Sequence, residues 1–208
     1  MHPNPAFRSK NDRPSIDFVR QRAFGVLTVN GPEHPLVAHI PFRLDERTAS
    51  IELHLMRSNP IWRVAETELP ALIAVTGPDG YIWPDWYDVP DQVPTWNYVA
   101  VHLHGTLSRV PQTELKDVLD RLSDTFESRL APKTPWRSAK MSDGVMDRMM
   151  RMIVPMRMTI TNIESTWKLN QNKSDELRMC AASKVETGFG SELAAFATLM
   201  QAPPKASE

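Results

Sequence analysis

Short segments that alternate apolar and polar residues follow one another through the first half of the chain. Residues 36–44, LVAHIPFRL, place leucine, alanine, isoleucine and phenylalanine on one face, and residues 50–56, SIELHLM, do the same with isoleucine and two leucines. A period of two is typical of a strand with one buried face. The same reasoning predicts strands at 23–29, 71–77, 81–84 and from 99 towards 110. A predicted break at Gly77-Pro78-Asp79-Gly80 separates the second of these strands from the third.

The connections between these strands are short and rich in residues that break regular structure, as in NGPEHP at 30–35. A further strand is expected much later, at 154–161, where VPMRMTIT returns to period two. Nearly consecutive antiparallel strands with short turns predict a small barrel, which the late strand closes. The expected fold class is therefore α+β, an antiparallel barrel with peripheral helices.

Helical spacing predicts the remaining elements. A first helix is expected at 15–23 with Ser15 as N-cap, and a short one at 58–66 with Pro60 near its first position. The segment 112–130 carries one apolar stripe, and 142–153 is expected to form a second amphipathic helix capped by Ser142. We interpret the methionines between 141 and 158 as core packing. Two more helices are expected at 174–186 and 191–200.

These elements predict one domain over residues 1–180, with a helical insertion at about 112–152, followed by a C-terminal helix and a loose tail over 181–208. A formal net charge of -1 leaves no global field to attract DNA or an anionic membrane. The single cysteine, Cys180, lies on a predicted helix and is interpreted as a buried apolar residue in a reducing compartment. With no apolar run that could span a bilayer and no signal-peptide core at the N-terminus, we expect a cytoplasmic protein without a membrane partner.

Motifs for familiar chemistry are few. No glycine-rich phosphate loop follows a strand. His102 and His104 share one strand face and could contact one metal ion, but no CxxC or HExxH motif accompanies them. We therefore favour a polar strand face or a subunit contact for these histidines and predict no metal site.

Two polar clusters stand out. In LHLMRSNPIWR, Arg57, Ser58 and Asn59 arrive where a short helix begins, which suits an anion site as well as an ordinary helix cap. In TWKLNQNK, Lys168, Asn170, Gln171 and Asn172 can direct hydrogen bonds at a heteroaromatic ring or a phosphate, or form a polar loop before a helix. The segments by themselves favour the cap and the polar loop.

Five segments in order give the chain a family resemblance: PLVAHIPF, RSNPIWR, GPDGYIWPDWY, VPTWNYVAVHLHG and KLNQNK. With them the chain resembles the PaiB-like proteins, which are FMN-binding negative transcriptional regulators. The resemblance extends from HPNPAF at the N-terminus to about residue 180. It departs from the family at Asp85, where a small residue is expected, and at Asn170, where serine is usual.

The resemblance implies a split β-barrel of the pyridoxamine-phosphate-oxidase type, paired as a homodimer with FMN in the groove between the barrels. Arg57, Ser58 and Asn59 become candidates for binding the phosphate, whereas Trp96 becomes a candidate anchor where subunits and flavin meet. The residues that the resemblance implies for cofactor binding are His39, Ile40, Pro41, His54, Arg57, Ser58, Asn59, Trp62, Trp96, Asn97, Lys168, Gln171 and Asn172. Catalytic residues are not indicated.

Three functions are compatible with the resemblance. The first is an FMN-binding regulator of transcription or a flavin-dependent sensor, although no DNA-binding motif is visible. The second is an FMN-dependent oxidoreductase, because the same groove could take a second substrate. The third is a haem-binding relative on the same barrel, for which His39, His54 and His102 are the available ligands. The sequence does not decide whether the protein is an enzyme.

Overall fold

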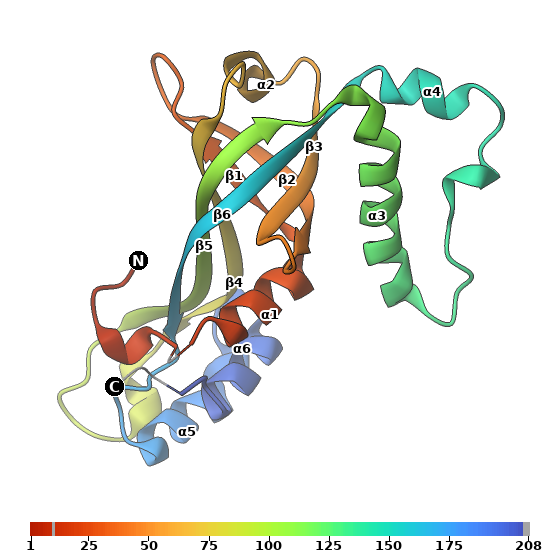
Figure 1. Ribbon diagram of the computed structural model, residues 1–208. Helices are drawn as coiled ribbons and strands as arrows, with labels where there is room; N and C mark the ends of the chain where they lie inside the picture. Colours follow the sequence, from red (N-terminus) through yellow and green to blue (C-terminus); the bar gives the residue numbers. More distant parts are fainter. Residues whose placement is uncertain (10, 206–208) are drawn as a thin grey trace. The chain divides into compact units, whose positions relative to one another are not determined.

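Residues 1–9 and 11–205 are described in a computed structural model, which divides into two compact units. One unit, here called the barrel unit, comprises Val19–Ala74 and Leu103–Asn162. The other, here called the terminal unit, comprises Met1–Phe18, Val75–His102 and Ile163–Glu208. Figure 1 shows the helices and strands with the labels used below.

The sheet consists of strands β1 to β7: Phe24–Val29, Leu36–Asp45, Ser50–Met56, Leu69–Ile82, Thr95–Arg109, Ile153–Lys168 and Gly190–Ser191. The helices α1 to α6 span Arg13–Arg22, Pro60–Val64, Leu115–Glu127, Val145–Met150, Asp175–Lys184 and Leu193–Gln201. Short 3₁₀ turns, including η1 (Pro5–Phe7) and η2 (Pro84–Tyr87), lie between them. None of the helices in the described part of the chain is long and apolar enough to cross a membrane.

Six strands form a closed antiparallel barrel, as the alternation predicted. The strand order is β1-β2-β3-β6-β5-β4, and β1 also pairs with β4. In the barrel unit β1 is antiparallel to both neighbours: Val26 lies opposite His39 of β2 and opposite Ala74 of β4. The late strand β6 inserts beside β3, with Leu53 opposite Met156. The fold is a split β-barrel with peripheral helices.

The inward faces of the barrel strands carry its core. Fully or nearly fully buried side chains come from every strand of the barrel unit: Leu27, Val29, Ile40, Phe42, Ile51, Leu53, Leu55, Ile73, Leu103, Leu107, Val154, Met156 and Met158. Helix α3 packs against β2 and β3 beside the barrel (Figure 1) through its buried residues Leu115, Val118 and Leu122. This is the apolar stripe that helical spacing predicted.

The terminal unit has a core of its own. The Phe18 and Trp167 rings meet edge to face with centroids 5.6 Å apart, and Trp167 Nε1 donates to Ser15 Oγ at 3.3 Å. Helices α5 and α6 pack against each other (Figure 1). The buried Arg178 of α5 donates to the carbonyl oxygens of Met200 and Gln201. These carbonyls belong to the last turn of α6, where the helix itself supplies no N–H partner.

The predicted break in the fourth strand is wrong, because β4 continues from Leu69 to Ile82 through the segment GPDG. Its glycines serve close packing instead of a turn. A Cβ atom on Gly77 would lie 2.7 Å from Phe18 Cζ and 2.9 Å from Val99 Cβ, and one on Gly80 would lie 3.1 Å from Phe196 Cε1. The late strand is also longer than predicted, since β6 ends at Lys168.

Two predicted helix caps are wrong. Helix α1 begins at Arg13, so Ser15 lies inside it and is buried, where it accepts the Trp167 hydrogen bond. Helix α4 begins only at Val145, after Gly144 in a left-handed conformation (φ +72°) with no side-chain cap. Ser142 lies before this turn and takes part only through its carbonyl oxygen.

The interpretation of the Met-rich stretch as core is correct only for its strand. Met156 and Met158 are buried in the barrel, whereas Met149 and Met152 are each about half exposed. Alternation along β6 fixes which side chains face inward, but the short helix α4 leaves Met149 exposed and Met146 and Met150 only partly buried. The lone cysteine, Cys180, is partly exposed on α5 instead of fully buried.

We expect the close contact between β5 and β6 to make Gly105 intolerant of any side chain. A Cβ atom there would lie 2.1 Å from the Thr159 carbonyl oxygen, which belongs to backbone and cannot rotate away. Gly105→Ala should therefore lower the free energy of unfolding by about 1–3 kcal/mol through forced separation of the two strands. Urea unfolding followed by circular dichroism measures the change.

Ser108→Ala is the matched control on the same strand. Its hydroxyl makes one long hydrogen bond, 3.4 Å to the Arg157 carbonyl oxygen, so its removal should cost less than about 1 kcal/mol. Equal stability of Gly105→Ala and the parent protein would show that the two strands separate without cost.

Candidate functional site

The predicted cofactor residues fall into two groups, one in each unit. The barrel unit contains the residues of β2, β3 and α2: His39, Ile40, Pro41, His54, Arg57, Ser58, Asn59 and Trp62. The terminal unit contains those near the start of β5 and the end of β6: Trp96, Asn97, Lys168, Gln171 and Asn172.

Arg57 follows β3 and is exposed, but its guanidinium is held in place. Nε donates to the Arg151 carbonyl oxygen at 3.1 Å, and Nη2 donates to Gln112 Oε1 at 3.2 Å. A guanidinium has five N–H donors, so three of them have no partner within the described residues. The arginine is thus oriented and retains the capacity to bind an oxyanion.

Asn59 is the N-cap of α2, as the cap interpretation of this segment predicted. Its Oδ1 accepts from the Ile61 backbone N–H at 2.9 Å, and Pro60 occupies the first helical position. The neighbouring Ser58 is exposed. The local fold therefore commits the asparagine side chain to the helix, while Arg57 and Ser58 keep polar groups at the surface.

His54 and Trp62 lie beside this turn and are each partly buried. Burial lowers the pKa of His54, which favours its neutral form. Its Nδ1 is buried without a hydrogen-bond partner in the described part of the chain. The Arg109 guanidinium lies 3.8 Å from the centre of the Trp62 ring and donates to the Trp62 carbonyl oxygen at 2.7 Å.

Three consecutive residues of β2 point in alternating directions. Ile40 is 2% exposed and belongs to the barrel core, so its side chain does not face outward. His39 is exposed and stacks on Phe24 with ring centroids 6.5 Å apart, and Pro41 is partly exposed. Of this trio, the histidine and the proline therefore present side chains on the outer face.

Lys168, at the end of β6, fastens the start of β5. Its Nζ donates to Thr95 Oγ1 at 2.5 Å and to the Trp96 carbonyl oxygen at 2.8 Å. Burial lowers the pKa of this lysine. Lys168 thus positions the Thr95–Trp96 segment through contacts within the terminal unit.

The residues around Lys168 shape the same loop. Gln171 Oε1 accepts from the Leu169 backbone N–H at 2.8 Å, and Gln171 Nε2 donates to the Trp167 carbonyl oxygen. Asn97, completely buried, donates from Nδ2 to Asn170 Oδ1 at 2.8 Å. Asn170 has a φ of +67°, a conformation that asparagine tolerates better than most residues. Asn172 is exposed.

Trp96 belongs to an aromatic cluster at the surface of the terminal unit. Its ring lies 5.6 Å from Phe189 and 6.4 Å from Tyr81, and the last two stack with centroids 5.1 Å apart. Trp96 is 43% exposed and Phe189 is 60% exposed. Trp96 is therefore not a core residue, and the cluster offers a broad apolar surface.

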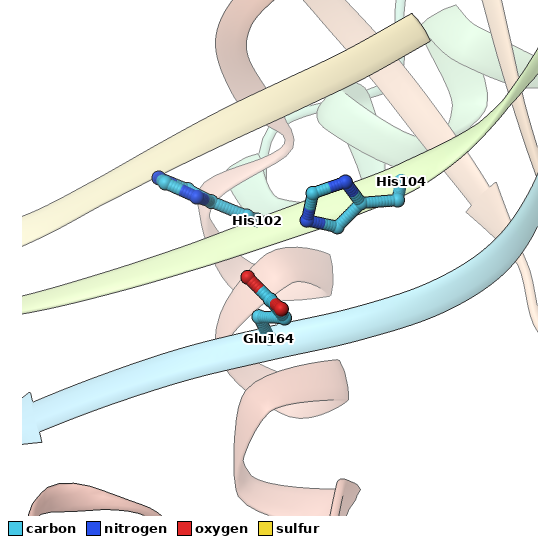
Figure 2. A group of neighbouring side chains, drawn as sticks. All are labelled: His102, His104 and Glu164. Carbon is cyan, nitrogen blue, oxygen red and sulfur yellow. The ribbon is translucent and has the colours of Figure 1, made fainter. Parts of the chain in front are cut away.

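Figure 2 shows His102 and His104 on β5 with Glu164 on β6. Within the terminal unit, the ligand atoms of His102 and Glu164 lie within 4.8 Å of each other. Imidazole and carboxylate groups are common zinc ligands. Within the terminal unit, a carboxylate thus lies beside His102.

Tyr81, Glu164 and Phe189 are the residues that sequence reasoning missed. Tyr81 belongs to the segment GPDGYIWPDWY, but that segment does not indicate a contact with Trp96, 15 residues further along the chain. Glu164 and Phe189 lie outside the motif segments and far along the chain from the residues that they approach. Glu164 lies beyond the predicted strand at 154–161, so alternation assigned it neither a strand face nor a neighbouring strand. Pairing of β5 with β6 supplies that information.

The side chains in each unit fit the chemistry of FMN. The oriented Arg57 with spare donors suits a phosphate group. The half-exposed Trp96 and its aromatic neighbours suit the apolar face of a flavin ring. Carbonyl, amide and hydroxyl groups near the end of β6 suit the polar edge of such a ring.

Comparison with known proteins identifies the family. A model described as “Putative FMN-binding domain” matches residues 1–162. The chain is 28% identical over 171 residues to “Protease synthase and sporulation protein PAI 2” of Bacillus subtilis, covering 81% of both proteins. It is 30% identical over 123 residues to the uncharacterized protein YKL070W of Saccharomyces cerevisiae, covering 53% of this chain and 73% of that protein.

Solved structures share the fold. The FAD and haem binding protein of Mycobacterium smegmatis matches with a TM-score of 0.58 at 17% identity, covering 77% of this chain and 73% of that one. The flavocytochrome Anf3 of Azotobacter vinelandii matches with a TM-score of 0.52 at 10% identity, covering 77% and 69%. The barrel, the donor set and the family match over residues 1–162 agree, and this chain belongs to the FMN-binding domain family, with FMN as its cofactor.

Proposed function

We propose that this protein is a PaiB-like, FMN-dependent sensor that acts as a negative regulator of transcription. The observation that carries the proposal is the similarity to PAI 2 of Bacillus subtilis over 81% of both chains, joined to the FMN-binding family match. A sensor needs a bound cofactor and a surface that responds to it. The exposed aromatic cluster of Trp96, Tyr81 and Phe189 supplies such a surface.

A direct role at DNA has little support in the basic residues between α3 and α4. Arg137 pairs with Asp124, and Lys140 donates to the Pro135 carbonyl oxygen at 3.1 Å. These contacts use cationic groups that a phosphate backbone would otherwise attract. We therefore propose that FMN occupancy changes a protein surface before any contact with DNA is made.

An FMN-dependent oxidoreductase is the second candidate. The half-exposed ring of Trp96 could stack a second substrate against the cofactor, which would supply the redox chemistry. Mixing the FMN-loaded protein with NADH or NADPH in air, where oxygen can reoxidise the reduced flavin, separates the two functions. Flavin reduction without sustained NAD(P)H oxidation supports the sensor, whereas sustained NAD(P)H oxidation supports the enzyme. A Soret band on adding haem would favour the haem-binding alternative.

For cofactor binding, we propose that Arg57 and Ser58 contact the FMN phosphate. The guanidinium is oriented by Arg151 and Gln112 and has three spare N–H donors, and the serine hydroxyl is exposed next to it. Charge-assisted hydrogen bonds of this kind are roughly twice as strong as neutral ones. His39, Pro41, His54, Trp62, Lys168, Gln171 and Asn172 are proposed to surround the flavin ring, directly or by positioning their neighbours.

For assembly, we propose a homodimer in which the aromatic face of the terminal unit is covered by the second copy. Between residues 83 and 96, four apolar side chains are at least 40% exposed: Trp83, Val89, Val93 and Trp96. Phe189 adds to them through its contacts with Trp96 and Tyr81. Exposed apolar patches of this kind mark interaction sites, and aromatic residues are enriched where protein surfaces meet.

We expect Arg57→Ala to weaken FMN binding about tenfold to hundredfold, because one charge-assisted hydrogen bond contributes about 1.5–3 kcal/mol. Fluorescence titration with FMN gives the dissociation constant. Arg63→Ala on α2 removes an equal charge from an exposed position and serves as the control. Thermal melting of both variants tests the fold. An unchanged FMN affinity in Arg57→Ala would remove the arginine from the phosphate site.

Trp96→Ala is expected to shift the monomer–dimer equilibrium at least tenfold towards monomer, because a partly exposed tryptophan is a typical anchor of an interface. Sedimentation equilibrium over a range of protein concentrations measures the shift. Leu130→Ala, which is 51% exposed in the barrel unit, is the matched control and should dimerise like the parent.

The variant Trp96→Ala should melt at nearly the same temperature as the parent when both are monomeric, since its ring is not in the core. A variant that dimerises normally at every concentration would contradict the proposed interface.

A further inference from the structure

A polar cavity of about 590 Å³ is lined by residues of the barrel unit. Its walls come from β2, the β2–β3 turn, β3, α3 and β6: Arg43, Asp45, Arg47, Thr48, Ser50, Glu52, Glu114, Arg121, Arg157 and Thr159. This volume is within the usual range for small-molecule sites, about 300–1,000 Å³. None of these residues belongs to the set proposed for FMN.

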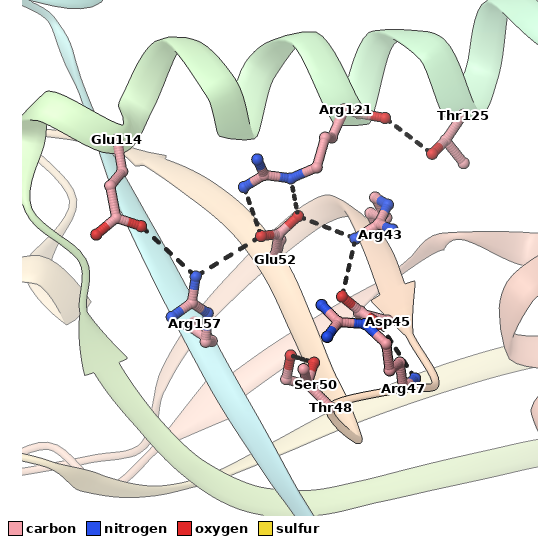
Figure 3. A network of polar contacts seen from close by, with 10 residues as sticks. All are labelled: Arg43, Asp45, Arg47, Thr48, Ser50, Glu52, Glu114, Arg121, Thr125 and Arg157. Atoms are coloured by element: carbon pink, nitrogen blue, oxygen red, sulfur yellow. Dashed lines mark hydrogen bonds and ion pairs between the residues drawn. The ribbon is translucent and has the colours of Figure 1, made fainter.

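Glu52 is the centre of the charged wall (Figure 3). The sequence predicted a solvent-facing strand position, but its side chain is only 7% exposed beside α3. Both its oxygens accept from Arg121: Oε2 from Nε at 2.9 Å and Oε1 from Nη2 at 2.7 Å. Arg43 Nη1 donates to Oε2 at 3.1 Å. This bidentate pair fastens α3 to β3.

The other charged groups of the wall are only loosely paired. Arg157 Nη2 lies 3.7 Å from Glu52 Oε1 and 3.7 Å from Glu114 Oε2, and both distances are too long for a hydrogen bond. The exposed Arg47 donates to Asp45 through its backbone N–H, and its guanidinium has no hydrogen bond to the described residues. Fastening α3 therefore does not require Arg47 or Arg157.

Four guanidinium groups face three carboxylates in this cavity, so one positive charge is in excess. Glu52 and Asp45 are held in their ionised form at neutral pH. Burial raises the pKa of Glu52, but the hydrogen bonds and charges of Arg121 and Arg43 outweigh it and hold the pKa below its usual value. Burial also raises the pKa of Asp45, but the charges of Arg43 and Arg47 and a hydrogen bond from the Arg47 backbone N–H hold that pKa below its usual value.

The loosely paired arginines lie on the two sides of β3. Arg157 is on β6 and Arg47 follows β2, and β3 lies between these two strands in the sheet. Figure 3 shows them on opposite sides of Glu52 and Ser50. Because neighbouring strands are about 4.8 Å apart, a ligand that contacts both needs anionic groups separated by several ångströms. Thr48, Ser50 and Thr159 add hydroxyl groups to the wall.

We propose that this cavity binds a small anionic ligand with at least two oxyanion groups, one contacted by Arg157 and the other by Arg47. The excess positive charge, the unused guanidinium donors and the hydroxyl-rich wall all favour such a molecule over a neutral or cationic one. Phosphates and carboxylates share this chemistry, and both accept the paired N–H groups of arginine. The site is additional to FMN binding and would let the protein respond to a second metabolite.

Isothermal titration calorimetry on the full chain tests the proposal with two probes, inorganic pyrophosphate and succinate. FMN is present at saturation, so the cofactor's own phosphate site is occupied. Saturable binding of either probe at one site per chain is expected. Pyrophosphate alone would identify a phosphorylated ligand, succinate alone would identify a carboxylic acid, and binding of both would identify a general dianion site.

Arg157→Gln and Arg47→Gln should each weaken the binding of that probe about tenfold or more, as expected for the loss of a charge-assisted contact. Arg148→Gln makes the same charge change on the exposed face of α4, outside the cavity, and should alter the affinity less than twofold. Arg57→Ala tests independence from the cofactor, because it should weaken FMN binding and leave probe binding without FMN unchanged.

Melting temperatures of Arg47→Gln and Arg157→Gln within a few degrees of the parent would confirm that these variants fold. Two outcomes would overturn the proposal. One is the absence of saturable binding of both probes to the parent protein. The other is equal weakening by Arg47→Gln, Arg157→Gln and Arg148→Gln, which would reveal attraction by total charge instead of a built site.

Discussion

The rest of this structure depends on the double pairing of β1. This six-residue strand hydrogen-bonds to β2 on one side and β4 on the other, which removes both free edges and turns a meandering sheet into a closed barrel. Closure buries one face of each strand. It also fixes the outer face, so polar residues on β2, β3 and β6 are held at set positions. The polar chemistry of the barrel unit is a consequence of that register.

The polar residues divide into those that organise the fold and those with spare capacity. Lys168, Gln171 and Asn59 satisfy backbone or neighbouring groups in their own segments. They shape loops and caps, as buried or half-buried polar groups must. Arg57, Arg47 and Arg157 keep guanidinium donors that have no acceptor among the described residues. These donors are available to an anionic ligand.

Much of the fold could be predicted because strand alternation and helical spacing are local signals. The inward residues of β2 and β3, the stripe of α3 and the late closing strand follow from periods of two and 3.6. The errors came where a local signal has two meanings. Glycine and proline in GPDG commonly indicate a turn, but here the glycines allow Phe18, Val99 and Phe196 to approach the backbone of β4. Serine at 15 and 142 suggested caps that the chain does not use.

The sequence by itself determined the alternation, the helical stripe and the motif segments, and hence the barrel and its family, because these depend on residues close together in the chain. Only the tertiary structure decided that Glu52 lies beneath α3 with Arg121, that Trp96 meets Tyr81 and Phe189, and that four arginines share one cavity. Each of these arrangements brings together segments that are separated in the sequence. Their meeting depends on strand order and helix packing, which local periodicity does not specify.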